Sequence, residues 1–273
     1  MGPNPNPNKA LWEKGDFTRI AQTMRESGEA VVRSLGVTKG LKVLDVGCGD
    51  GTTAIPAAKL DAEVLGVDIS TPLVAAAKKR AQEMGLGNVR FQEGDASDLA
   101  GLPDKSFDLV MSIFGAMFAP RPIDVAKALV RVTKSGGRIV MGNWIPGDPT
   151  LVAQLLKISS AYSPPPPAGF ISPMLWGVEK EIQERFGAAG ISADRISCVK
   201  DTYMFNYAGS PAAFVNDFRH YYGPTMNAFA AAEQNGKAED LAKELIELFT
   251  AQNTSSNGGC SIPASFMRVT VNV

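Results

Sequence analysis

Residues 43–52 read VLDVGCGDGT and carry the strongest structural signal in this sequence. An apolar run leads into three glycines at alternate positions, Gly47, Gly49 and Gly51, and helix-compatible sequence follows them. Glycine has no Cβ and tolerates positive φ, so a ligand can lie directly against the main chain of such a turn. The stretch therefore predicts a strand that ends at the carboxyl edge of a parallel sheet, where nucleotide-like cofactors bind.

The glycine spacing departs from that of two common phosphate-binding loops. Thr52 stands where a dinucleotide fingerprint has its third glycine, and no Lys-Ser/Thr pair follows as it does in a P-loop. Asp45 lies two residues before the first glycine, where it can brace the turn or accept from a cationic group. Asp68 ends the next apolar run at a spacing that suits a carboxylate accepting both hydroxyls of a ribose. NAD-dependent enzymes use the same device, so Asp68 does not identify the cofactor.

Strand-like and helix-like segments alternate along the first half of the chain. Helical patterns fall at about 17–35, after Asp68 and at about 123–133. Apolar runs predict strands near 41–46, 63–68, 88–93, 107–112 and 137–143. This alternation is typical of a doubly wound α/β sheet with helices on both faces.

Beyond Trp144 the alternation lapses. Residues 145–176 are rich in proline, and the stiff run at 164–167 favours a lid held over a pocket. A helix is predicted around 178–186 and a sixth strand near 195–205. Two helical segments within 210–252 predict a cap over the active site, and 265–271 alternates like a seventh strand.

These patterns divide the chain into a core and its additions. The predicted parts are a disordered lead-in (1–10), a cofactor-binding core with an N-terminal helix (11–144), a proline-rich lid (145–176), the completion of the core sheet (177–207 and 260–273) and a helical cap (208–259).

Composition argues against several classes of partner. The net charge is −1 with scattered Lys and Arg, which disfavours nucleic acid and anionic membrane surfaces. No apolar run approaches the roughly 20 residues that a membrane span needs, and the N-terminus lacks the pattern of a secretion signal. Three widely spaced cysteines favour a reducing cytoplasm. One histidine without neighbouring Cys or carboxylates predicts no metal site.

Three further segments identify the family that this sequence resembles. Gly94-Asp95-Ala96 follows the third strand, then come residues 106–112 (SFDLVMS) and 131–140 (RVTKSGGRIV). In order and spacing, these resemble the motifs of class I S-adenosylmethionine-dependent methyltransferases, particularly the UbiE-like (type 11) small-molecule group. The resemblance covers about residues 41–144. It departs from the family at Ser135, where proline is usual, and in a shorter loop at 102–104.

The resemblance implies a seven-stranded Rossmann-like sheet whose last two strands pair antiparallel, with a helical cap before the last strand. It implies S-adenosylmethionine as cofactor, S-adenosylhomocysteine as product, and cofactor contacts from Phe17, Asp45, Gly47, Cys48, Gly49, Asp68, Ile69, Asp95, Ala96, Ser112 and Ile113. Backbone bracing is the competing role for Asp45 and Ser112. The residues expected to bind the acceptor are Phe114, Met117, Trp144 and Tyr221, with core packing as the alternative for the aromatic stretch after Ser112.

His220 is the sole candidate for a catalytic base. A neutral imidazole can take a proton from a hydroxyl or enol during methyl transfer. A packing or hydrogen-bonding role on an aromatic-rich helix is the competing interpretation, because no partner carboxylate is identifiable.

The predicted function is methyl transfer from S-adenosylmethionine to an O, N or C nucleophile of a small molecule, mainly by proximity and desolvation. The sequence points to no nucleic-acid, membrane or metal partner and is silent on oligomeric state. A non-catalytic S-adenosylmethionine-binding protein and an NAD-dependent oxidoreductase remain as alternatives.

Overall fold

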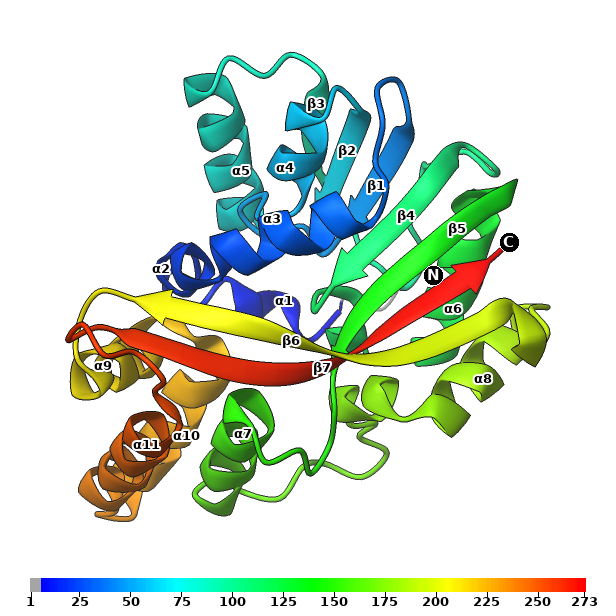
Figure 1. Cartoon of the computed structure of the whole chain (residues 1–273). Helices are drawn as coiled ribbons and strands as arrows, with labels where there is room; N and C mark the ends of the chain where they lie inside the picture. The colour runs from blue at the N-terminus through cyan, green and yellow to red at the C-terminus, as the bar shows by residue number, and fades with distance from the viewer. Residues whose placement is uncertain (1–5) are drawn as a thin grey trace.

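Seven strands form a single sheet in the computed structural model, which describes residues 6–273 (Figure 1). The strands are β1 (Lys42–Val46), β2 (Glu63–Asp68), β3 (Val89–Glu93), β4 (Phe107–Ile113), β5 (Thr133–Trp144), β6 (Ile196–Tyr207) and β7 (Cys260–Asn272). Their order is β3-β2-β1-β4-β5-β7-β6, and β7 runs antiparallel to both of its neighbours while the other pairs are parallel. The predicted fold class and the antiparallel pairing of the last strands are confirmed.

Successive residues of the central strands face two separate cores. Val43 pairs with Leu109, and both lie in the core beneath α3 (Arg25–Ser34), α4 (Ala54–Lys59) and α5 (Thr71–Glu83). Leu44 and Val110 are the next pair along, and they lie in the core that includes α6 (Pro122–Val132) and α8 (Glu179–Gly187). Because both sheet faces are buried, the strands are nearly continuous apolar runs.

The paired strands β6 and β7 extend beyond the rest of the sheet and carry the cap (Figure 1). Pairing of β7 with β5 stops at Phe266, whereas its pairing with β6 continues to Cys260. Three helices connect these strands: α9 (Pro211–Tyr221), α10 (Gly223–Gln234) and α11 (Ala238–Gln252). Together with α7 (Leu151–Ala161), they form the group of helices below the two strands in Figure 1.

Short helices complete the chain. At the N-terminal end these are α1 (Lys9–Trp12), α2 (Thr18–Ala21) and the 3₁₀ turn η1 (Gln22–Met24). Further along are the 3₁₀ turns η2 (Ala116–Phe118), η3 (Pro173–Gly177) and η4 (Ala193–Arg195). The predicted helix over 17–35 is thus a series of α2, η1 and α3.

Two predicted segments differ from the structure. The expected cap of two helices has three, because Tyr222-Gly223-Pro224 interrupts the first and Asn235-Gly236 the second. Residues 6–10 of the expected disordered lead-in are folded, since Asn8 contacts η2 and α1 begins at Lys9. Residues 1–5 lie outside the described part of the chain.

The predicted lid over residues 145–176 reaches the cavity through its apolar helix and not through its proline run. The run at 164–167 is exposed and contributes nothing to the cavity described below, whereas Val152 and Leu155 of α7 line it. An apolar helix can bury side chains over a cavity, while a proline run has no regular partner for its backbone. Over residues 6–273, no helix is long and apolar enough to cross a membrane.

Candidate active site

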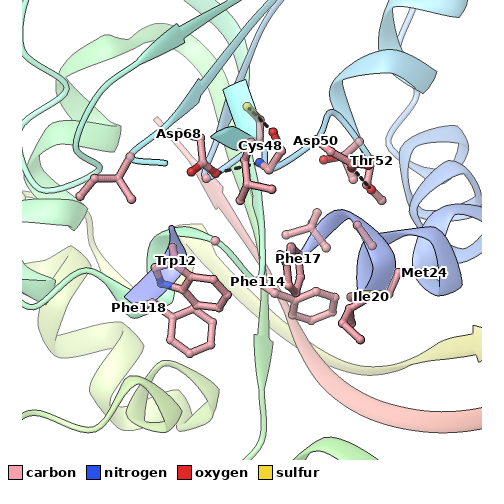
Figure 2. A pocket seen from close by; sticks show the side chains of 18 of the residues that line it. Trp12, Phe17, Ile20, Met24, Cys48, Asp50, Thr52, Asp68, Phe114 and Phe118 are labelled. Carbon is pink, nitrogen blue, oxygen red and sulfur yellow. Dashed lines mark hydrogen bonds between the residues drawn. The ribbon is translucent and has the colours of Figure 1, made fainter. Parts of the chain in front are cut away.

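A cavity open to the surface lies at the carboxyl ends of the parallel strands. One part of its wall is polar and comes from the glycine turn and the ends of β2 and β3. The remainder is apolar and comes from the N-terminal helices, the end of β4, α7, β6 and the cap. Figure 2 shows Asp68, Asp50 and Thr52 on one side of this space and Trp12, Phe17 and Phe118 across from them.

The glycine turn after β1 has the open backbone that the sequence predicts. Gly47, Gly49 and Gly51 have φ of +69°, +54° and +84°, all in the left-handed region that favours glycine. At Gly47 the backbone of Gly115 approaches so closely that a Cβ would lie 2.5 Å from its Cα. At Gly49, by contrast, a Cβ would meet nothing within 4 Å. Gly49 therefore presents bare main chain to the cavity, as a cradle for a ligand requires.

Asp68 ends β2 with its carboxylate tied to the glycine turn. Its Oδ2 accepts from the Gly49 amide at 2.8 Å and its Oδ1 from the Ser70 amide at 2.9 Å. Burial raises the pKa of Asp68, while the backbone amides of Ser70, Gly49 and Ile69 oppose the shift. Each oxygen retains a lone pair for a further donor, so the carboxylate can accept two hydroxyl groups.

Asp95 is contacted by the N-terminal arm, which we define as residues 6–13. Asn6 Nδ2 donates to Asp95 Oδ2 at 3.0 Å, and the Ser97 amide donates to Asp95 Oδ1 at 2.8 Å. Lys9 adds an ion pair with Glu93 at the end of β3. The arm therefore crosses the ends of β2 and β3 and forms part of the cavity wall.

Asp50 lies in the turn and is fixed by two arginines. Arg25 Nη2 and Arg80 Nη1 each lie 2.9 Å from its carboxylate, and Thr52 donates to it at 2.9 Å. Arg25 belongs to α3 and Arg80 to α5, so the carboxylate joins two helices to the turn. Asp50 is 1% exposed, and a buried carboxylate is stable only with such partners.

Asp45 and Ser112 do not line the cavity, and both bond to the surrounding scaffold. Thr53 donates to Asp45 at 2.6 Å and thereby links β1 to the start of α4. Ser112 donates to the Val46 carbonyl at 2.6 Å and accepts from the Ala116 amide at 2.8 Å. These contacts fit the bracing role that the sequence left open as the alternative to a cofactor contact.

Asp45 also carries a testable pH dependence. Its carboxylate is fully buried, Oδ1 has no partner in the described chain, and burial raises the pKa to about 7. The folded protein thus retains a proton that the unfolded chain releases above its ordinary pKa of 3.8. Stability contributed by this group is present at low pH and is lost as the pH rises from about 4 to 7.

We expect Asp45→Asn to remove this loss, because the amide keeps the bond from Thr53 and never ionises. Relative to the wild type, its free energy of unfolding should rise with pH by about 3 kcal/mol at most between pH 4.5 and 7.5. Urea unfolding at several pH values measures this difference. Parallel stability curves for the two proteins would contradict it.

The apolar part of the cavity is built mainly from aromatic rings. Phe114 stacks on Trp144 with centroids 3.6 Å apart, and Tyr203 meets Phe114 edge-on at 4.9 Å. Trp12 lies edge-on to Phe118 at 4.8 Å. The remaining aromatic lining residues are Phe17, Phe205, Phe218 and Tyr222. Rings around an enclosed space exclude water and favour a flat, apolar ligand.

The predicted site residues separate into two sets. Those that line the cavity are Phe17, Gly47, Cys48, Gly49, Asp68, Ile69, Asp95, Ala96, Ile113, Phe114 and Trp144. Cys48 is buried, and burial raises the pKa of its thiol well above the usual range, which fits packing and not nucleophilic chemistry. Besides Asp45 and Ser112, the predicted residues outside the cavity are Met117, Tyr221 and His220.

The last three lie outside for different reasons. Met117 belongs to η2, is 1% exposed and packs in the core. Tyr221 is half-buried at the end of α9, where Arg19 lies 5.5 Å from its ring. His220 is exposed, and its Nδ1 lies 2.8 Å from the Asn216 carbonyl of its own helix, so it does not face the cavity as a base would.

Several lining residues were not predicted. Asn6 and Asn8 come from the arm, Ile20, Ala21 and Met24 from α2 and η1, and Phe205 and Phe218 from β6 and the cap. The Pro-Asn repeat at the N-terminus is the one sequence signal that could have indicated the arm.

Comparisons with known proteins agree with this geometry. A family model described as "Methyltransferase domain" matches residues 44–141. Uncharacterized protein Rv1405c of Mycobacterium tuberculosis is 31% identical over 243 residues, covering 88% of this chain and 86% of that protein. Demethylmenaquinone methyltransferase of Geobacillus kaustophilus is 39% identical over 115 residues, which are 41% of this chain and 49% of that enzyme. The chain belongs to the class I S-adenosylmethionine-dependent methyltransferases.

The solved structures support the methyltransferase fold. YcgJ from Bacillus subtilis superposes with a TM-score of 0.56 at 22% identity, covering 90% of this chain and 97% of that chain. The strand order, with β7 antiparallel, and the match to the methyltransferase family both favour a methyltransferase over an NAD-dependent oxidoreductase.

Proposed function

We propose that this methyltransferase binds S-adenosylmethionine at the glycine turn and transfers its methyl group to a small, largely apolar acceptor in the aromatic part of the cavity. The observation that carries the proposal is the division of one cavity into two walls. Bare backbone and carboxylates face it from the strand ends, and rings face it from the opposite side.

The residues of the polar wall fit this cofactor. Asp68 can accept the two ribose hydroxyls, because both of its oxygens are already oriented by backbone amides. Gly49 has room for the amino-acid portion against its main chain, since no atom lies within 4 Å of its Cβ position. Asp95 and Ala96 are placed for the adenine edge, with Asp95 accepting from the exocyclic amine.

The acceptor side does its work by alignment and exclusion of water. The cofactor supplies an activated methyl group, so the protein needs chiefly to hold a nucleophile in line with it. Among the described lining residues there is no Lys, Arg, His or Glu, and the three aspartates lie at the polar wall. This composition supports a small uncharged acceptor, as opposed to nucleic acid, and catalysis by proximity and desolvation.

Calorimetric titration with S-adenosylhomocysteine tests the cofactor half of the proposal. We expect saturable binding in the micromolar range with one site per chain. Absence of saturable binding at high micromolar ligand would reject it. Detection of methylated product by mass spectrometry then tests transfer and separates an enzyme from a protein that only binds the cofactor.

We expect Asn6→Ala to tighten S-adenosylhomocysteine binding about threefold to tenfold. Asn6 lines the cavity beside Asp95 and donates to its Oδ2, so its side chain competes with the adenine amine for the space at this carboxylate. Asn8→Ala is the matched control, because Asn8 donates to the Phe118 carbonyl and leaves Asp95 untouched. Weaker binding by Asn6→Ala would show that the arm holds the cofactor and does not compete with it.

A further inference from the structure

Two tyrosines of the cavity wall have hydroxyls that form no hydrogen bond with residues 6–273. Tyr203 is 1% exposed and Tyr222 is 6% exposed, and both line the cavity. Neither hydroxyl oxygen is among the fully buried polar atoms without a partner, so each can be reached from the cavity. The Tyr162 hydroxyl, in contrast, donates to Glu244 at 2.6 Å at the surface.

The two tyrosines belong to different parts of the cavity wall. Tyr203 projects from β6 toward α3 and the glycine turn: a Cβ added to Gly28 would lie 2.9 Å from its oxygen and 2.7 Å from Thr52 Cγ2. Tyr222 lies between α9 and α10, with its ring 5.4 Å from Phe218 and 6.1 Å from Trp12. Tyr203 is thus near the polar wall, and Tyr222 belongs to the aromatic wall.

A ligand that fills the cavity removes water from these two hydroxyls, and leaving a desolvated hydroxyl without a partner is unfavourable. A polar atom on the ligand would offset that cost. Packing of the rings does not require the hydroxyl, because phenylalanine has the same ring and differs from tyrosine only by the hydroxyl group. Burial raises the pKa of both tyrosines, so each remains protonated at neutral pH and can donate. No basic side chain among the described lining residues offers a partner for an anionic group.

We infer that Tyr203 and Tyr222 determine acceptor specificity by hydrogen bonding to an uncharged, ring-containing apolar molecule that carries at least one oxygen or nitrogen acceptor. The inference rests on the proposed function, because it takes the apolar part of the cavity as the acceptor site. The hydroxyls position the polar atom of the acceptor, and the rings of Phe114, Trp144 and Phe118 hold its apolar body. A hydrocarbon of the same shape would leave both hydroxyls unpaired and would be selected against.

A matched pair of probes, 2-naphthol and naphthalene, tests this inference. Equilibrium dialysis of the protein saturated with S-adenosylhomocysteine gives the dissociation constant of each probe and hence their ratio. We expect Tyr203→Phe combined with Tyr222→Phe to reduce the preference for 2-naphthol about fivefold to tenfold. The single variants show which hydroxyl binds the naphthol oxygen.

Tyr221→Phe is the control, since Tyr221 neighbours Tyr222 in sequence and lies outside the cavity; its ratio should equal that of the wild type. An unchanged ratio in the double variant would overturn the inference. So would a loss of S-adenosylhomocysteine affinity without any change in the ratio, because the hydroxyls would then serve the cofactor. If the wild type binds no S-adenosylhomocysteine, the proposed function fails, and the probe ratio without it still tests the two tyrosines.

Discussion

Replacing Gly47 with alanine is expected to destabilise the protein by about 2–4 kcal/mol. The new Cβ would lie 2.5 Å from Gly115 Cα and 2.8 Å from its carbonyl carbon, and neither is a side-chain atom that can rotate away. The φ of +69° adds strain for any residue other than glycine. Moving Gly115 would disturb the loop after β4, which carries Phe114 into the acceptor wall. Urea unfolding measures the loss of stability.

Gly49→Ala is the control for Gly47→Ala, because its φ is similar and its Cβ would meet no atom within 4 Å. We expect it to cost about 1 kcal/mol of stability and to weaken S-adenosylhomocysteine binding at least tenfold, since the methyl group would enter the cofactor cradle. Equal stability of the two variants would mean that the contact between the two backbones does not constrain the turn.

The second large effect is expected at Asp68. We expect Asp68→Asn to weaken S-adenosylhomocysteine binding about 100-fold, because hydrogen bonds to a charged group are among the strong ones and two ribose hydroxyls are involved. The amide has nearly the size of the carboxylate, but it offers one acceptor oxygen in place of two. Calorimetry measures the affinity, and a change within about threefold would mean that the ribose lies elsewhere.

Asp108→Asn provides the matched control for Asp68→Asn. Asp108 also accepts from a backbone amide, that of Lys42 at 2.9 Å, and it pairs with Lys134 at 2.7 Å. It lies near the start of β4, at the sheet edge away from the cavity. Its replacement should leave the affinity unchanged. Thermal unfolding of both variants separates a loss of binding from a loss of structure.

The sheet and the cofactor wall were predictable because their signals are local. Each central strand is an apolar run buried on both faces, and the glycine turn requires φ angles that only glycine adopts readily. Asp68 follows from its place at a strand end. The antiparallel pairing of β7 came from the family resemblance, because an alternating strand pattern does not reveal its direction.

The acceptor wall was harder to predict because it depends on which way the cap helices face. His220 and Tyr221 are the last two residues of α9, where neighbouring side chains point about 100° apart, and Tyr222 follows them in extended backbone between α9 and α10. Only Tyr222 reaches the cavity, since the helix turns His220 to solvent and Tyr221 toward Arg19. Packing between segments that are distant in sequence decides which of these three aromatic side chains faces the cavity.

For polar residues at the ends of strands, it was difficult to predict which side chains reach the ligand. Asp45 and Ser112 lie where cofactor contacts are expected, yet their side chains bond to Thr53 and to the Val46 carbonyl. A strand alternates its side chains between faces, so a shift of one residue decides whether a group meets the ligand or the scaffold. The sequence indicated the correct edge of the sheet, but it did not show whether each side chain meets the ligand or the scaffold.

The N-terminal arm has a practical consequence for anyone who purifies this enzyme. A tag fused ahead of Met1 would lie five residues from Asn6, which donates to Asp95, and we expect its bulk to alter access to the cavity. Val273 instead bonds with the backbone of Gly136 and Gly137 at the opposite edge of the sheet. Affinity handles therefore belong at the carboxyl terminus, and kinetics obtained with an N-terminal one should differ from those of the tag-free protein.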